Sequence, residues 1–276
     1  MVEKLLEIEN LKTYFYTSKG MVKAVDDVSL AISEQRVVGL VGESGCGKSM
    51  TALSILRLVP PPGRTITGRV CFLGRNLLEL SEKEMTQVRG RKISMVFQDP
   101  MTYLNPVMKV GRQIGETLRR HKGLRPQEVH KEVIELLKAV QVPEPATVAD
   151  YYPHQLSGGM RQRVLISIAL SCNPSLVIAD EPTTALDVTV QAQILNLIKR
   201  LVREYRISLL LITHDLGIVA DICDYVYVMY AGKIVEGADV FTLFKEPMHP
   251  YTQALIRSVL SLDEFRETLI AIEGTV

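Results

Sequence analysis

The junction between residues 36–41 and residues 42–49 constrains the fold more than any other part of the chain. The first run is continuously apolar after Arg36 and rich in β-branched residues, which is typical of a strand buried on both faces. The octapeptide that follows has the pattern G-x-x-x-x-G-K-S, and a helical pattern runs from residue 50 to residue 58. Strand, glycine-rich loop and helix in this order predict an α/β fold that holds phosphate groups.

The loop of residues 42–49 is expected to form a phosphate cradle. Its glycines let successive backbone N–H groups converge on phosphate oxygens, and the helix start adds a partial positive charge. Lys48 would reach the β- and γ-phosphates, the Ser49 hydroxyl would ligate Mg²⁺, and the Ser49 and Met50 N–H groups would face the α-phosphate. An ordinary glycine-rich turn is the alternative, but the order of strand, loop and helix argues against it. The residues predicted to bind nucleotide here are Gly42, Glu43, Ser44, Gly45, Cys46, Gly47, Lys48, Ser49 and Met50.

The rest of the chain shows two further kinds of pattern. Residues 176–179 and 209–212 resemble the first apolar run, so we expect a parallel α/β core. Residues 5–41 alternate short apolar and polar runs, which predicts an antiparallel sheet with one solvated face. Between about residues 100 and 165 the strand pattern disappears, and Pro126 opens a helical pattern, which indicates an inserted helical lobe. Its apolar positions are Val129, Val133, Leu136, Leu137 and Val140.

Composition excludes several classes of protein. With 276 residues, 47% of them hydrophobic, the chain can bury a sizeable core. Its 32 Lys and Arg against 31 Asp and Glu give a net charge of +1, which provides no global attraction to nucleic acid. The four cysteines include no C-x-x-C pair, which argues against a disulfide framework or a zinc site. No uncharged apolar run reaches the roughly 18 residues of a membrane span, so we expect membrane contact only through another protein.

Polar residues follow the predicted core strands. Asp180 and Glu181 end a buried strand, a costly arrangement unless a cation or a substrate uses them. Asp180 is predicted to support Mg²⁺ and Glu181 to act as the base that polarises water, although helix capping could explain one of the two. Gln98, at the junction with the helical lobe, could complete the Mg²⁺ shell or hold water while transmitting movement of the lobe, whereas alone it would be a solvated turn residue. His214 follows a strand at the edge where ligands gather, but a lone histidine there is as often structural.

A second glycine motif, Ser157-Gly158-Gly159, precedes a helix predicted to begin near Gly159. Its glycines permit close approach of a phosphate, and the helix start directs a positive dipole end at it. Because the chain already has one complete cradle, this second motif suggests that two subunits share each nucleotide. Taken alone, the motif could be an ordinary helix cap. The presence of the other motifs in this order argues against that interpretation.

In this order the motifs resemble the ATP-binding cassette (ABC) family along nearly the whole chain. GESGCGKS, VFQDP, LSGGM, VIADEP, the ALD of residues 185–187 and His214 match its Walker A, Q-loop, signature, Walker B, D-loop and H-switch. The resemblance implies Mg-ATP between two head-to-tail cassettes. Ser157, Gly158 and Gly159 then serve the γ-phosphate of the opposite subunit, and Asp187 belongs to the nucleotide site. The catalytic residues that the resemblance implies are Glu181, His214 and Gln98. The metal-binding residues that it implies are Ser49, Gln98 and Asp180.

The family also stacks adenine on an aromatic residue near the N-terminus. By position we favour Phe15, with Tyr14 and Tyr16 as alternatives, since adjacent strand residues point to opposite faces.

A narrower resemblance is to the ATPases of dipeptide, oligopeptide and nickel importers. It is carried by QDPMTYLNP at 98–106, YPHQ at 152–155, DVTVQAQ at 187–193 and HPYT at 249–252. Met50 and the Leu58-Val59-Pro60 segment look like the first of the two non-identical ATPases of such systems. The implied partners are two transmembrane permeases, a second ATPase subunit, identical or not, and indirectly an external substrate-binding protein. The implied location is the cytoplasmic face of the membrane, as a peripheral subunit.

We therefore expect one ABC ATPase domain over residues 1–276, with a P-loop NTPase (RecA-like) core. Residues 1–99 and 166–245 would form this core with its antiparallel β subdomain, residues 100–165 the helical signature subdomain, and 246–276 a C-terminal extension. Related chains often continue into a cysteine-bearing tail that can hold an iron–sulfur cluster, so ending at Val276 would indicate a truncated chain or a short member. The runner-up is a soluble ABC ATPase acting on DNA or ribosomes. The chain lacks the coiled-coil insertion, second cassette and basic patch of those classes, so no nucleic-acid partner is expected.

Overall fold

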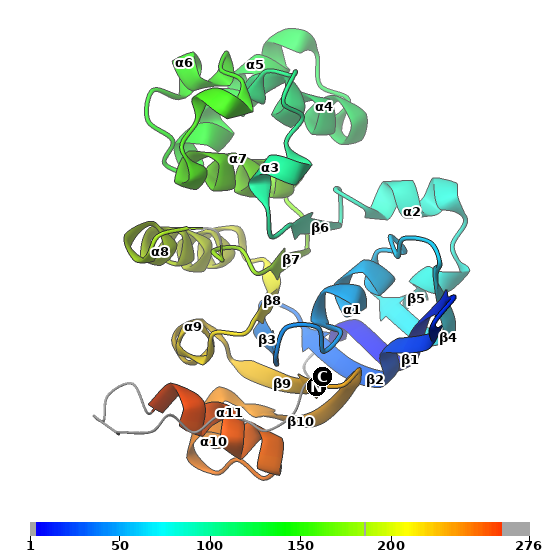
Figure 1. The fold of residues 1–276 in the computed structure, drawn as a ribbon. Coiled ribbons are helices and arrows are strands. Elements are labelled where there is room, and N and C mark those ends of the chain that lie inside the picture. The colour runs from blue at the N-terminus through cyan, green and yellow to red at the C-terminus, as the bar shows by residue number, and fades with distance from the viewer. Residues whose placement is uncertain (1–3, 185, 261–276) are drawn as a thin grey trace. The chain divides into compact units, whose positions relative to one another are not determined.

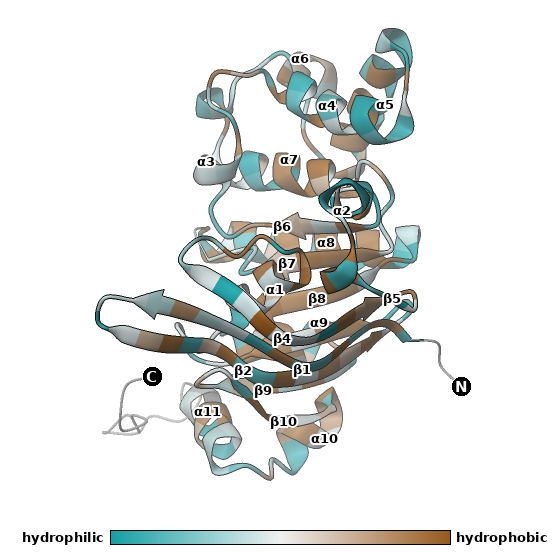
Figure 2. Cartoon of the chain, turned by 90° about the vertical axis from the view of Figure 1, so that its right-hand side faces the viewer, coloured by the Kyte–Doolittle hydropathy of each residue, from teal (hydrophilic) through white to brown (hydrophobic). Residues whose placement is uncertain are grey.

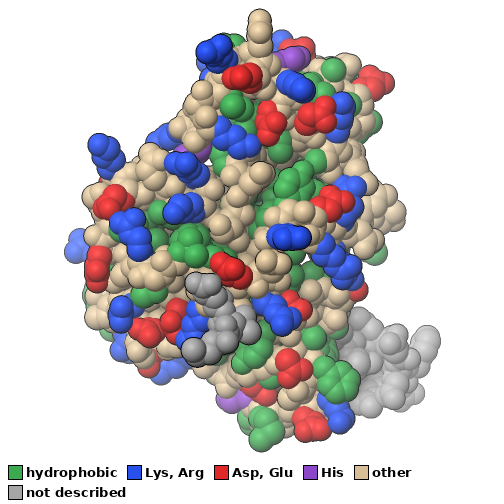
Figure 3. All heavy atoms as spheres, turned by 180° about the vertical axis from the view of Figure 1, so that it is seen from behind, with side chains coloured by type: hydrophobic (Ala, Val, Ile, Leu, Met, Phe, Trp, Pro, Cys, Tyr) green, Lys and Arg blue, Asp and Glu red, His purple; other side chains and the backbone are tan. Residues whose placement is uncertain are grey.

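The computed structural model describes residues 4–184 and 186–260, and the chain divides into two compact units (Figure 1). The N/C unit comprises Met1–Leu80 and Leu210–Val276, and the middle unit comprises Ser81–Leu209. Blue and red side chains are interspersed over the face drawn in Figure 3, in keeping with the net charge of +1. Among residues 4–184 and 186–260, no helix is both long and apolar enough to span a bilayer.

The N/C unit contains a four-stranded sheet with the order β2-β1-β4-β5. Strand β1 (Lys4–Thr17) pairs antiparallel with β2 (Gly20–Ser33) on one side and with β4 (Gly63–Phe72) on the other, and β5 (Arg75–Asn76) extends the sheet. The register sets Leu6 opposite Ile32 and Ile8 opposite Leu30, all of them buried. The antiparallel sheet predicted from the alternating pattern is therefore confirmed, although its last predicted residues belong to β3.

A second group of strands in the N/C unit carries the phosphate loop. Strand β3 (Val37–Val41) is buried at every residue and pairs in parallel with β9 (Tyr225–Tyr230), which pairs antiparallel with β10 (Lys233–Asp239). Strand β8 (Ser208–Thr213), also buried throughout, enters the unit from residue 210. The helices are α1 (Lys48–Ile55), α9 (Leu216–Ile222), α10 (Val240–Lys245) and α11 (Pro250–Leu260), with a 3-10 turn η1 at Leu77–Glu79.

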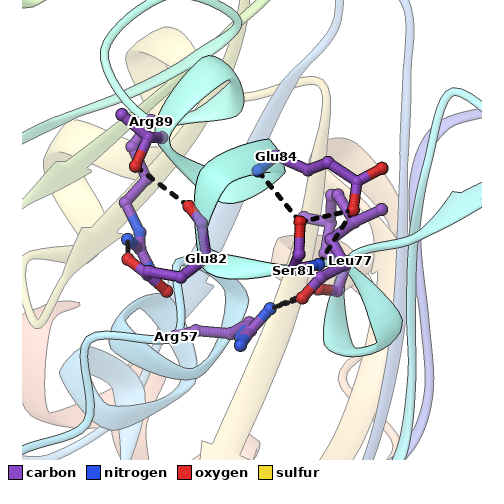
Figure 4. Close-up of polar contacts among 8 residues, drawn as sticks. Arg57, Leu77, Ser81, Glu82, Glu84 and Arg89 are labelled. Carbon is purple, nitrogen blue, oxygen red and sulfur yellow. Dashed lines mark hydrogen bonds and ion pairs between the residues drawn. The ribbon is translucent and has the colours of Figure 1, made fainter.

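Helix α1 ends at Ile55, three residues before the predicted end at Leu58. Arg57 adopts a left-handed conformation with φ 54°, which stops the helix, and the Arg57 N–H donates to the Ser54 carbonyl. The Arg57 guanidinium donates to the carbonyls of Leu77 and Leu80, which compensates for this unusual backbone (Figure 4). The left-handed Arg57 and the Leu58 N–H, which donates to the Leu53 carbonyl at 2.8 Å, end α1, and the Arg57 side chain ties this end to residues 77–80.

The middle unit is mainly helical. Its helices are α2 (Glu82–Val88), α3 (Pro100–Tyr103), α4 (Val110–Lys122), α5 (Pro126–Ala139), α6 (Pro145–Ala149), α7 (Gly158–Leu170) and α8 (Val188–Tyr205), with a 3-10 turn η2 at Pro153–Gln155. Strands β6 (Ile93–Val96) and β7 (Leu176–Asp180) pair in parallel. Hydrophilic and hydrophobic colours alternate along α5 in Figure 2, and the predicted positions Val129, Val133, Leu136 and Leu137 are buried. The expected helical segment is thus present, while the subdomain boundaries remain predictions.

Helix α2 begins with a capping box. The Ser81 hydroxyl accepts from the Glu84 N–H, and the Glu84 carboxylate accepts from the Ser81 N–H at 2.9 Å (Figure 4). Two N–H groups at the helix start thereby gain partners that the helix itself cannot supply.

Candidate nucleotide-binding site

The loop of residues 42–49 joins β3 to α1 and depends on glycine at three positions. Gly42, Gly45 and Gly47 have φ angles of 153°, 85° and 110°, a region that residues with a Cβ rarely adopt. A Cβ on Gly42 would lie 2.1 Å from the Met229 carbonyl oxygen, and one on Gly47 would lie 2.1 Å from that of Ala24. Both obstacles are backbone atoms, so the loop cannot keep this path with a larger residue at either position.

Lys48 lies inside the loop and is only 4% exposed. Its ammonium group donates to the carbonyl oxygens of Gly42 and Glu43, both at 2.7 Å. Helix α1 begins here without a side-chain cap and without an acidic residue in its first turn, as far as the described residues extend. Cation, helix dipole and loop N–H groups therefore combine at one place, where they favour an anion such as a phosphate.

The three aromatic candidates of β1 lie in different surroundings. Tyr14 donates its hydroxyl proton to Asp26 at 2.6 Å, and this hydrogen bond raises the pKa of Tyr14 to about 12. Tyr16 is 51% exposed, whereas the Phe15 ring lies against Gly63. Phe15 shares its side of the strand with Thr13, whose hydroxyl is 2.8 Å from that of Ser54 in α1. Phe15 is therefore on the side of β1 that faces the phosphate-loop helix, and its contact with adenine remains a prediction.

His214 also belongs to the N/C unit. It is exposed directly after β8, at the carboxyl end of that strand. The next residue, Asp215, caps α9 by accepting from the N–H groups of Gly217 at 2.8 Å and Ile218 at 3.2 Å. This cap fixes the turn that presents His214 to solvent.

The middle unit brings Gln98 and Glu181 together. Because β6 and β7 run in parallel with Val96 opposite Ala179, the residues that follow both strands emerge at the same edge. The Gln98 amide donates to the Glu181 carboxylate at 3.0 Å, and the Thr184 hydroxyl donates to it at 2.8 Å. Glu181 has φ 44°, an unusual conformation for a residue with a side chain and one that often occurs at functional sites. Asp180 beside it is 6% exposed.

The signature segment starts α7. The Ser157 hydroxyl accepts from the Met160 N–H at 3.3 Å, and both Ser157 and Gly158 are exposed. A Cβ on Gly159 would lie 2.6 Å from the Val190 side chain of α8, so this glycine allows α7 to pack against α8. The helix-cap interpretation is thus correct for Ser157, and it leaves the exposed Gly158 unexplained.

Asp187 starts α8, where its carboxylate accepts from the Val190 N–H at 3.0 Å. The residue predicted for the nucleotide site therefore also caps a helix. Sequence reasoning missed Thr184, a neighbour of Glu181, because a threonine three residues after a glutamate is not a recognisable pattern. The predicted residues are carried by both units: the loop, Phe15 and His214 by the N/C unit, the others by the middle unit.

A buried strand, a phosphate loop and a helix define a nucleotide-binding α/β protein, and comparison with known proteins identifies its family. Residues 25–184 match the family model described as ABC transporter, and residues 235–276 match that of the oligopeptide/dipeptide transporter C-terminal region. The oligopeptide transport ATP-binding protein AppD of Bacillus subtilis is 50% identical over 273 residues, covering 99% of this chain and 83% of that protein. The dipeptide transport ATP-binding protein DppD of the same organism is 50% identical over 275 residues, with coverages of 99% and 82%.

A solved structure gives the same result. The dimeric, post-hydrolysis structure of the ATP-binding cassette MJ0796 bound to ADP and Pi has a TM-score of 0.76 and 28% identity, and the match covers 85% of this chain and 98% of that one. The chain belongs to the ABC transporter family. The predicted P-loop NTPase fold and ATPase class are therefore confirmed, and the relatives support a transport subunit rather than an ATPase acting on DNA or ribosomes.

Proposed function

We propose that this chain is the ATP-hydrolysing subunit of an importer for dipeptides or oligopeptides. The observation that carries the proposal is the phosphate loop, in which Lys48 and the start of α1 converge. The names of the relatives AppD and DppD, and the match of residues 235–276, support peptides as the transported class. Nickel, the other cargo suggested by the resemblance, is the second candidate.

The donor set suits Mg²⁺. The predicted ligands are the Ser49 hydroxyl, the Gln98 amide and the Asp180 carboxylate, all hard oxygen donors. No group of three or more His, Cys, Asp and Glu side chains suited to a metal occurs in residues 4–184 and 186–260. A magnesium ion held by these few protein groups and by phosphate oxygens would not need such a cluster. When bound, it would neutralise charge on the phosphates.

Glu181 is the proposed base. Gln98 and Thr184 donate to its carboxylate and fix its orientation. In that orientation the carboxylate would accept a proton from a positioned water. His214 would contact the γ-phosphate.

Gly158, exposed at the start of α7, would meet the nucleotide of a second ATPase subunit, identical or not. The dimeric state of the related cassette bound to ADP and Pi supports this assignment.

The segment around α3 is the proposed docking surface for a permease. Phe97 and Tyr103 stack with ring centroids 3.8 Å apart, and the side chains of Met101, Tyr103 and Val107 are 51%, 50% and 82% exposed. Exposed apolar groups beside Gln98 could transmit movement of a partner to the catalytic edge of β6 and β7. Crosslinks from a cytoplasmic permease loop should concentrate at residues 98–106. Crosslinks confined to residues 199–206 of α8 would contradict this placement.

Two permeases would hold the chain at the cytoplasmic face of the membrane. An external binding protein would select the cargo without touching this subunit.

Lys48→Ala and Asp180→Asn test the nucleotide site. Lys48→Ala should weaken ATP binding, and Asp180→Asn should impair Mg²⁺-dependent hydrolysis, whereas Lys83→Ala at an exposed position of α2 should change neither. Wild-type ATPase activity in both site variants would contradict the assignment. Uptake of labelled dipeptide, oligopeptide and nickel by the reconstituted transporter would then identify the cargo class.

A further inference from the structure

Tyr251 of the HPYT segment contacts the phosphate loop. The segment lies at the start of α11, and Tyr251 is buried with 8% of its surface exposed. Its hydroxyl accepts a hydrogen bond from the Glu43 N–H at 3.0 Å, and its ring lies 4.6 Å from that of Tyr230. Burial raises the pKa of Tyr251 to about 12, so the hydroxyl stays neutral at physiological pH. Both partners belong to the N/C unit.

The position of Tyr251 is itself fixed by hydrogen bonds. The Glu236 carboxylate of β10 accepts from the N–H groups of Met248 at 2.7 Å and His249 at 2.9 Å. The His249 imidazole in turn accepts from the Tyr251 N–H at 3.1 Å. The segment is therefore tied to β10, and the ring of Tyr251 projects from a braced turn.

The same part of the loop is held from several sides. The Glu43 peptide donates its N–H to Tyr251, while its carbonyl accepts from Lys48 at 2.7 Å. The Cys46 carbonyl accepts from the Gly232 N–H at 2.9 Å, at the turn between β9 and β10. Tyr251 is the one side-chain hydroxyl among these anchors, so it can be altered without changing the backbone.

We infer that Tyr251 is a positioning residue for the phosphate loop, in that its hydroxyl fixes the Glu43 peptide and so preorganises the N–H groups that follow for phosphate. The inference rests on the proposed nucleotide binding by this loop. It gives the HPYT segment a role in nucleotide affinity. A loop that must order itself on binding loses affinity relative to one already ordered.

The test compares Tyr251→Phe with Tyr227→Phe in the full chain. Tyr227 is the control, because its hydroxyl also accepts from a backbone N–H at 3.0 Å, that of Ala31 in β2, and donates to the Ala31 carbonyl at 3.4 Å. For Tyr251→Phe the KM for ATP should rise about three- to tenfold, the effect of one lost hydrogen bond, with kcat nearly unchanged. Tyr227→Phe should lower the unfolding temperature about as much as Tyr251→Phe does. Unlike Tyr251→Phe, it should leave the KM for ATP unchanged. An unchanged KM in Tyr251→Phe, or an equal rise in both variants, would overturn the inference.

Hydrogen exchange covers the case in which Tyr251→Phe does not fold. In the wild-type protein the Glu43 amide should exchange slowly, and exchange at the rate of an open loop would contradict the inference. Lys48→Ala separates the two proposals. Unchanged nucleotide affinity in Lys48→Ala would refute nucleotide binding by the loop. If Lys48→Ala loses affinity as expected but Tyr251→Phe does not, only the role of Tyr251 is refuted.

Discussion

The two glycine motifs of this chain depend on glycine for different reasons. In the phosphate loop, Gly42 and Gly47 have left-handed φ angles, and a Cβ at either position would meet backbone oxygen at 2.1 Å. In the signature, Gly158 lies in a helix, and a Cβ there would meet only the Leu186 side chain at 3.3 Å. The first motif is required by the folding of this chain. The second leaves Gly158 exposed without a backbone obstacle to a larger residue, and its contact with the nucleotide of a second subunit is part of the proposed function.

The largest effect is expected from Glu181→Gln, which tests whether both motifs act on one nucleotide. The amide has nearly the same shape but cannot accept a proton as a carboxylate does, so hydrolysis should fall about 10²–10⁴-fold, or roughly 3–5 kcal/mol. Both motifs remain intact, so ATP should bind and a nucleotide-bound dimer should accumulate. Light scattering in the presence of ATP and Mg²⁺ measures the fraction of dimer, both for this chain alone and for this chain mixed with a candidate partner ATPase. Glu204→Gln on α8 is the control, and persistent monomers in both settings would contradict the shared nucleotide.

Gly47→Ala should disrupt the fold around the phosphate loop as well as ATP binding. The added methyl group combines a strained φ of 110° with a backbone collision, so the free energy of unfolding should fall by about 2–4 kcal/mol. Denaturant unfolding and ATP titration measure the two effects. Gly45→Ala provides the comparison, because its φ is 85° but nothing lies within 4 Å of its Cβ. Equal stability losses would show that conformation alone, without the collision, makes glycine necessary.

Gly158→Ala should separate folding from function. Because alanine favours helices and Leu186 is a flexible neighbour, the free energy of unfolding should change by less than about 1 kcal/mol. ATP binding to the isolated subunit should also persist, while hydrolysis by the dimer should fall about 10–100-fold as the methyl group fills the exposed space. Wild-type hydrolysis in this variant would remove the distinction between the two motifs.

Ser157→Ala should have a small effect on stability. It removes the cap of α7, in which the hydroxyl accepts from Met160 at 3.3 Å, and should cost about 1 kcal/mol. Ser81→Ala removes the cap of α2 and should cost a similar amount without altering hydrolysis. If both variants keep normal ATPase activity, Ser157 serves only as a helix cap.

The sequence predicted the elements near each motif because their signals are local. The unbroken apolar run before residue 42 is explained by a strand buried at every position, and the 3.6-residue period from Val129 to Leu137 by one buried helix face. The end of α1 was predicted wrongly, since Arg57 adopts a left-handed conformation that ends the helix, and its side chain donates to carbonyls of Leu77 and Leu80, far along the chain. Hydrophobic periodicity contains no information about such a partner.

By itself the sequence determined the kind of fold and the order of the motifs, because glycine spacing, strand burial and helix starts depend on backbone conformation within a few residues. Only the tertiary structure decided which aromatic residue of β1 faces α1, and which donor holds the carboxylate of Glu181. The Gln98–Glu181 contact spans 83 positions and the Glu43–Tyr251 contact spans 208. Such pairs form only when distant elements pack, so neither residue carries a local sign of the other.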